Sequence, residues 1–192
     1  MERRIWRTLL LVSILAVAPG ASAQDAAVPT ITVRIDDKAG VQGALLNIAK
    51  ARATEVFAMS GIRIEWIDGK QAARQKVSAA YMILIMAEAP AKLKAAMEQL
   101  GTDVMGQGAP SVGRAYIYYD RVVAFRPVPP RDIPSTLGDV LAHELGHLIL
   151  PPGHSPVGIM RPTINMQSRR VETFSESEAT EIHSRLRTRS AE

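Results

Sequence analysis

The sequence contains no cysteine among its 192 residues. The chain can therefore form no disulfide, and it has no thiolate to act as a nucleophile or a metal ligand. A domain of this length can bury a core large enough to fold without disulfides. Any covalent or metal chemistry must therefore rest on side chains other than cysteine.

No apolar run is long enough to span a bilayer. The N-terminal run Leu9–Val17 has nine residues and contains Ser13, whereas a spanning helix needs roughly 20. Three arginines precede this run, and the small-residue pattern Ala-Ser-Ala at 21–23 follows it, as is typical of a cleavage site. We expect residues 1–23 to be a signal peptide and residues 24–192 to be one secreted or periplasmic domain. We expect no stable membrane anchor after cleavage.

Charge of one sign is not concentrated anywhere along the chain. The 23 basic and 19 acidic residues give a formal net charge of +4. Removal of the expected signal peptide takes away three arginines and one glutamate and leaves a charge of about +2. No basic stripe of the kind that follows a phosphate backbone is present, so we expect no nucleic-acid partner.

The order of apolar patterns along the chain predicts an α+β or three-layer single domain. Alternating or continuous apolar runs predict strands at 30–35, 62–67, 79–87 and 115–125. Helical spacing predicts helices at 41–59, 90–100, 135–150 and from 175 onward. The run at 79–87 is continuously apolar, which predicts a strand covered on both faces. The glycine-rich segment 101–113 is predicted to be a loop, and the proline-rich segment 126–134 an extended connector.

Capping patterns locate the starts of the last two helices. Thr136 with Asp139 three residues later resembles a capping box, so one helix is expected to begin near Ser135. Ser175 with Glu178 three residues later predicts the start of the final helix.

The helix predicted at 135–150 carries the segment His143-Glu144-Leu145-Gly146-His147. Residues four apart on a helix lie on the same face, so both imidazoles can reach one Zn²⁺ ion without distortion. Glu144 lies beside the two histidines, where it can accept a proton from an attacking water. Three of the four histidines of the chain, including His154, lie within twelve residues, which strengthens the prediction of a metal site.

The segment HELGHLILPPGHSPVGIMRP at 143–162 resembles the active-site signature of the metzincin metallopeptidases, and within them that of the matrixins. The family pattern is HExxHxxGxxH followed by a methionine turn. This resemblance implies that His143, His147 and His154 are the metal ligands and that Glu144 is the general base. It also implies that Met160 forms the turn beneath the metal. The implied fold is an α+β, metzincin-like single domain that has a mixed twisted sheet, an active-site helix and a C-terminal helix.

The chain departs from the family pattern at the third ligand. The family glycine is replaced by Leu150, and His154 lies eleven residues after the first histidine instead of ten. Gly153 beside it can supply the backbone angles that the turn needs. A downstream carboxylate stays open as an alternative third ligand. The candidates are Glu172, Glu176, Glu178 and Glu181. His183 is expected to be a surface residue of the last helix.

These patterns predict an exported zinc-dependent endopeptidase that acts on proteins or peptides, with Zn²⁺ as its cofactor and Glu144 as its general base. By analogy with the family, an extended peptide would lie along an edge strand at 115–119. Two alternatives stay open, namely a catalytically inactive module stabilised by zinc and a zinc amidase acting on cell-wall peptides. The sequence leaves the oligomeric state undetermined.

Overall fold

The computed structural model describes residues 28–75, 79–100, 104–125, 132–163 and 170–190. The expected signal peptide and most of the proline-rich connector lie outside these described residues. Within them, no helix combines the length and the apolar character that crossing a membrane requires.

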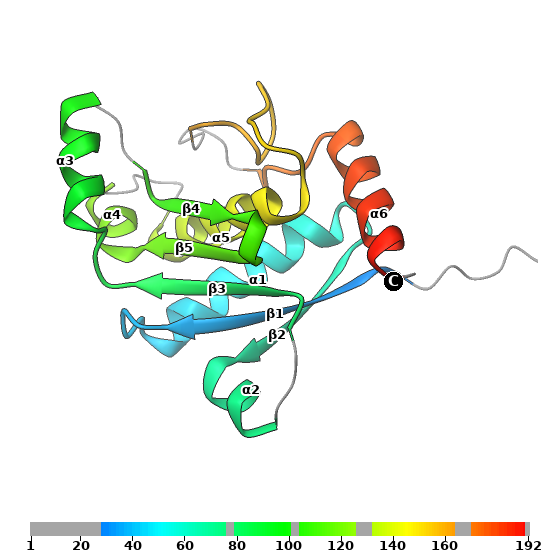
Figure 1. Ribbon diagram of the computed structural model, residues 1–192, viewed down its shortest axis with the longest axis horizontal. Coiled ribbons are helices and arrows are strands. Elements are labelled where there is room, and N and C mark those ends of the chain that lie inside the picture. Colours follow the sequence, from blue (N-terminus) through cyan, green and yellow to red (C-terminus); the bar gives the residue numbers. More distant parts are fainter. Residues whose placement is uncertain (1–27, 76–78, 101–103, 126–131, 164–169, 191–192) are drawn as a thin grey trace, which may run out of the picture.

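A five-stranded mixed sheet forms the frame of the protein (Figure 1), with the strand order β2-β1-β3-β5-β4. The strands are β1 (Thr30–Asp37), β2 (Arg63–Asp68), β3 (Tyr81–Met86), β4 (Gly106–Ala109) and β5 (Arg114–Tyr118). Strands β1, β2, β3 and β5 run parallel, and β4 pairs with β5 antiparallel at one edge. The predicted α+β fold with a mixed sheet is confirmed.

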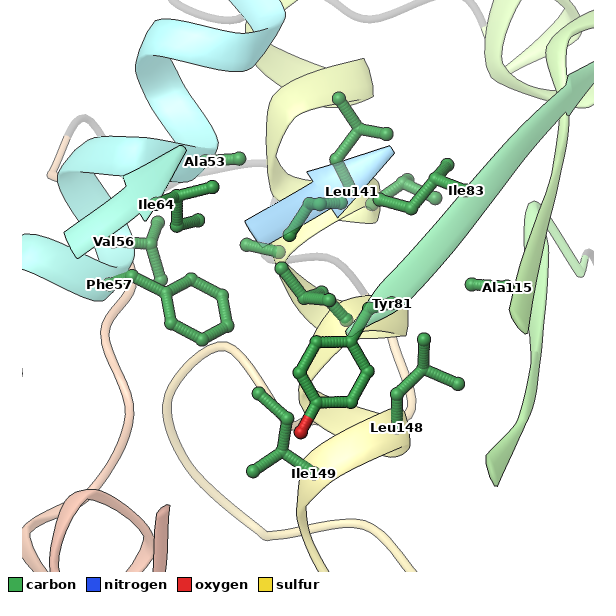
Figure 2. Close-up of a cluster of buried hydrophobic side chains, with 14 of the residues drawn as sticks. Ala53, Val56, Phe57, Ile64, Tyr81, Ile83, Ala115, Leu141, Leu148 and Ile149 are labelled. Atoms are coloured by element: carbon green, nitrogen blue, oxygen red, sulfur yellow. The ribbon is translucent and has the colours of Figure 1, made fainter. Parts of the chain in front are cut away.

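The larger helices supply the layer that covers one face of this sheet. The helices are α1 (Gly43–Ala58), α2 (Gly69–Gln75), α3 (Ala91–Leu100), α4 (Tyr119–Ala124), α5 (Ile133–Ile149) and α6 (Glu176–Ser190), with a short 3₁₀ turn, η1, at Pro110–Val112. Helices α1 and α5 lie behind the sheet in the view of Figure 1. In Figure 2 the side chains of these two helices lie against those of the strands, namely Ala53, Val56, Phe57, Leu141, Leu148 and Ile149 against Ile64, Tyr81 and Ile83. The main core therefore lies between α1, α5 and the sheet.

Strand β3 differs from its prediction, because only one of its faces is fully covered. Tyr81, Ile83 and Ile85 are buried on the face towards α1 and α5, while the alternate residues are only half-buried. Its continuous apolar run was expected to be covered on both faces. The second face is covered only in part, by a smaller apolar cluster that includes Met97 of α3.

The segment 104–125 also differs from its prediction. The expected strand at 115–125 ends at Tyr118, and its second half is α4. Strand β5 lies between β3 and β4 and is not an edge strand. The edge strand on this side of the sheet is β4, which lies within the segment 101–113 that was predicted to be a loop. Glycine disfavours strands locally, and here pairing with β5 overrides that preference.

Helix α5 begins two residues earlier than predicted and with a different cap. The Asp132 side chain accepts a hydrogen bond from the Ser135 amide at 2.8 Å, so Asp132 is the N-cap. Asp139 was expected to take part in the cap. It instead forms an ion pair with Arg52 of α1 at 2.9 Å. This buried contact ties α1 to the helix that carries the histidines.

Candidate metal centre

Three histidine side chains converge beside helix α5. The Nε2 atom of His147 lies 3.0 Å from Nε2 of His143 and 3.2 Å from Nε2 of His154. One ligand atom from each histidine lies within 4.8 Å of the others. Three nitrogens bound to one tetrahedral Zn²⁺ would be about 3.3 Å apart, given zinc–nitrogen distances near 2.0–2.1 Å. The donor set and its spacing therefore fit a zinc ion.

The ring of His143 is held in one orientation by the chain that follows the helix. Its Nδ1 atom lies 2.8 Å from the carbonyl oxygen of Ile159. Because a carbonyl can only accept, Nδ1 carries the proton and Nε2 keeps a free lone pair. A backbone carbonyl in this position fixes the tautomer that metal binding requires.

Burial keeps two of the three imidazoles neutral. Burial lowers the pKa of His147 to about 4, and the neighbouring His143 and His154 add to this effect. The pKa of His143 is also lowered, mainly by burial, although its bond to Ile159 opposes the shift. Neutral imidazoles are the form that binds metal, so little proton competition is expected from these two rings at neutral pH.

The loop after α5 brings His154 back towards the helix. Gly153 has a φ of 131°, a backbone conformation that favours glycine and that was predicted for this position. Two backbone hydrogen bonds of 2.9 Å then fix the loop, from the Ser155 amide to the Met160 carbonyl and from the Ile159 amide to the Thr173 carbonyl. The extra residue before His154 is thus accommodated within the loop.

Met160 packs against the helix between the two histidines. A β-carbon at Gly146 would lie only 2.5 Å from Sδ of Met160, and the Met160 side chain is buried. Gly146 lies one residue before His147, so the absence of a side chain there lets the methionine pack closely against the helix next to the histidines.

Glu178, one of the open alternatives for the third ligand, has two other partners. One carboxylate oxygen accepts the hydroxyl of Ser155, and the other accepts the Ser175 amide at 2.7 Å. The second contact completes the capping box that was predicted for α6. The first connects α6 to the residue that follows His154. Within the described residues, Glu178 does not belong to the cluster of potential metal ligands.

These contacts predict different zinc affinities for variants of the loop and of α6. We expect Glu178→Ala to weaken zinc binding by about 10- to 100-fold, as is typical when a group that orients a ligand is lost. His154→Ala should weaken zinc binding further, because a ligand is lost. Competition with a chromophoric chelator measures both values.

Glu181→Ala is the matched control for this experiment, because Glu181 lies on the same helix and pairs with Arg185 at 2.5 Å. Its zinc affinity should equal that of the wild type. Complete loss of zinc in Glu178→Ala with retention in His154→Ala would instead make Glu178 the third ligand.

Glu144 lies beside the histidines and is almost fully buried. Its side chain is 5% exposed, and within the described residues its Oε2 atom has no hydrogen-bond partner. Burial raises its pKa to about 8, and a hydrogen bond from the backbone of Gly108 opposes this shift. A carboxyl group with a pKa near the working pH is suited to accept and release a proton.

The edge strand β4 packs directly over this carboxylate. A β-carbon at Gly106 would lie 2.6–2.8 Å from three side-chain atoms of Glu144, and one at Gly108 would lie 2.8 Å from Cβ of His147. Neither glycine was predicted from the sequence as a site residue. Their only signal was the Gly-x-Gly spacing, which places both on one face if the segment is a strand.

His183 lies away from the cluster. Its Nε2 atom is 2.7 Å from the carbonyl oxygen of Ser60, and its ring contacts the position of Gly61. The residue was expected on the surface of the last helix. It is half-buried, and it joins α6 to the turn after α1. His183 therefore has a structural contact outside the metal centre.

No family model and no curated protein sequence matches this chain. Solved structures do match it. One is an archaemetzincin from Methanopyrus kandleri, with 14% sequence identity and a TM-score of 0.53, covering 83% of this chain and 97% of that one. Another is a zinc-dependent peptidase from Methanocorpusculum labreanum, with 16% identity and a TM-score of 0.54, covering 78% of this chain and 99% of that one. The chain therefore has the fold of these zinc peptidases.

Proposed function

We propose that the protein is a zinc-dependent peptidase whose metal is held by His143, His147 and His154. The observation that carries the proposal is the convergence of the three Nε2 atoms, with separations of 3.0 and 3.2 Å, beside the buried carboxyl group of Glu144. The shared fold with an archaemetzincin and a zinc-dependent peptidase supports it.

The reaction would be hydrolysis of a peptide bond. A bound Zn²⁺ ion would polarise the scissile carbonyl and lower the pKa of a water molecule. Glu144 accepts the proton of the attacking water and passes it to the leaving amine. The burial of Glu144 excludes bulk water, which raises its proton affinity towards that of a base useful near neutral pH. The Ile159 carbonyl keeps the ring of His143 in its binding orientation.

The substrate would lie along β4, which is the edge strand beside Glu144. An extended peptide can add to the free edge of a sheet through main-chain hydrogen bonds. Close packing of β4 against Glu144 and His147 places that edge next to the ligand cluster. This position replaces the edge strand that was predicted at 115–119.

We also propose that the protein is exported and that it is similar to the matrixins. The N-terminal segment 1–23 has the pattern of a cleavable signal peptide, so we assign the protein to a secreted or periplasmic location. Ser155 and the sequence Met160-Arg161-Pro162 resemble matrixins within the metzincins. An endopeptidase acting on internal bonds fits a substrate that continues along a strand edge in both directions.

The proposal is tested by metal removal and restoration. The purified chain should bind one zinc ion, cleave members of a mixed peptide library, lose activity on chelation and regain it with one equivalent of zinc. Mass spectrometry of the products identifies the bonds cleaved. The His183→Ala variant, which lacks a histidine outside the cluster, should bind zinc and cleave as the wild type does.

Zinc bound at one equivalent with no cleavage of the library would contradict peptidase activity and favour a zinc-stabilised module. Cell-wall peptides included in the same library distinguish an amidase. Cleavage confined to those substrates would identify that alternative.

A further inference from the structure

The backbone amides of Gly106 and Gly108 in β4 point away from β5, the strand with which β4 pairs. The Tyr118 amide donates to the Met105 carbonyl at 2.8 Å, which makes Met105 and Tyr118 a hydrogen-bonded pair. Opposite residues in an antiparallel ladder alternate between hydrogen-bonded pairs and pairs whose amides face away. The register pairs Gly106 with Ile117 and Gly108 with Ala115. The amides of both glycines therefore face the free edge.

The backbone of Gly108 lies beside Glu144. A β-carbon at Gly108 would lie 3.6 Å from the carbonyl oxygen and 3.7 Å from Oε2 of Glu144, and the outward-facing amide favours the ionised carboxylate. Within the described part of the chain, Oε2 of this carboxylate has no hydrogen-bond partner. The orientation of the carboxylate thus depends on the backbone of β4.

The space that Glu144 occupies exists because residue 106 has no side chain. A β-carbon there would lie 2.6 Å from Cγ, 2.7 Å from Oε1 and 2.8 Å from Cδ of Glu144, closer than non-bonded atoms approach. Neither Gly106 nor Gly108 has a positive φ, so an alanine would suit the backbone at either position. The requirement for glycine at position 106 therefore comes from Glu144 and not from the strand.

We infer that Gly106 and Gly108 are positioning residues for Glu144. The Gly108 amide orients the carboxylate, and the missing β-carbon at Gly106 leaves room for it beside the histidines. The inference rests on the proposed function, because it assigns these glycines to the general base of that reaction. It adds that the strand edge proposed to bind the peptide also sets the position of the base. The same strand would therefore position both the general base and the backbone of the peptide.

Kinetics of Gly106→Ala provide the first test. Displacement of a catalytic group by about 1 Å costs on the order of 100-fold, so kcat should fall by about that factor. KM should change little, and zinc should stay at one equivalent, because the three atoms nearest to the added β-carbon all belong to Glu144. Gly43→Ala is the control, since a β-carbon at that position meets nothing within 4 Å.

A double-mutant cycle separates positioning from a general effect on the strand. Glu144→Asp withdraws the carboxylate by one methylene and lowers kcat by itself. Gly106→Ala should cause a smaller further loss in Glu144→Asp than in the wild type, because aspartate lacks Cδ and Oε1, two of the three atoms that the added β-carbon would strike. Equal losses in the two backgrounds, or an unchanged kcat in Gly106→Ala, would overturn the inference.

A stability measurement gives the same comparison without any activity. In the metal-free protein, Gly106→Ala should lower the urea midpoint of the wild type and leave that of Glu144→Ala almost unchanged. Should Gly106→Ala fail to fold, recovery of the fold in the Glu144→Ala background would support the inference. An equal fall in both backgrounds, or failure to fold in both, would overturn it. Absence of peptide cleavage by the wild type would contradict the proposed function alone.

Discussion

Glu144→Gln is expected to abolish peptide cleavage while leaving zinc bound. Glutamine has nearly the shape of glutamate but cannot accept the proton of the attacking water. General-base catalysis contributes typically 10²- to 10⁴-fold, so kcat should fall by about 100- to 10,000-fold at saturating zinc. The three histidines are unaltered, so zinc stoichiometry and affinity should stay close to those of the wild type. Steady-state kinetics and zinc titration measure the two quantities on the same preparation.

Glu181→Gln is the control for this substitution. Its side chain pairs with Arg185 on the surface of α6, and both kcat and zinc binding should equal those of the wild type. Turnover by Glu144→Gln within about tenfold of the wild type would remove Glu144 from its role as general base. Loss of zinc together with activity would make the carboxylate part of the metal site instead.

The free energy of unfolding of the metal-free protein is expected to fall as the pH rises from about 5 to 8, because of the buried carboxyl group of Glu144. Burial raises the pKa of Glu144 from its ordinary value of 4.5 to about 8. The folded state therefore holds this proton more tightly than the unfolded state does. Well below pH 4.5, Glu144 is protonated in both the folded and the unfolded state, and its ionisation does not lower the free energy of unfolding. As the pH rises towards 8, the unfolded state ionises first, and the free energy of unfolding falls.

Glutamine at position 144 does not titrate, so the Glu144→Gln variant should not lose stability in this way as the pH rises. Each pKa unit corresponds to about 1.4 kcal/mol, so the stability of Glu144→Gln relative to the wild type should rise by about 3 kcal/mol between pH 5 and pH 8. Urea unfolding of both proteins at several pH values, with a chelator present, measures this difference. Every other ionisable residue is the same in the two proteins, so the difference between them reports on position 144.

Parallel stability curves for the two proteins would contradict a raised pKa at Glu144. Zinc provides an internal check, because a nearby cation favours the ionised carboxylate and opposes the effect of burial. The difference between the two proteins should therefore shrink when zinc is present. A difference that persists at saturating zinc would indicate that the ion does not bind beside Glu144.

The sequence by itself determined the part of the candidate site that lies within one turn of helix. Residues four apart on a helix share a face whatever the surrounding fold, so the pairing of His143 and His147 follows from local geometry. The capping box of α6 was predictable for the same reason, since Ser175 and Glu178 are three residues apart. The strands and helices with clear apolar periodicity were also predictable, and with them the α+β fold.

The tertiary structure decided every contact between segments distant along the chain. Glycine-rich sequence favours a loop, and only pairing with β5 makes Gly106–Ala109 a strand. The Asp139 side chain could have capped its own helix, and it instead pairs with Arg52 of α1 across the core.

The candidate third ligand shows most clearly the difference between what local spacing predicts and what tertiary packing decides. Spacing along the chain left His154 and the downstream glutamates, including Glu178, open, because a long irregular segment can bring any of them near the helix. In the folded chain, Glu178 accepts the hydroxyl of Ser155, and His154 lies 3.2 Å from His147. Local geometry sets which side chains share a helix face, whereas packing between distant segments decides which side chain completes the cluster.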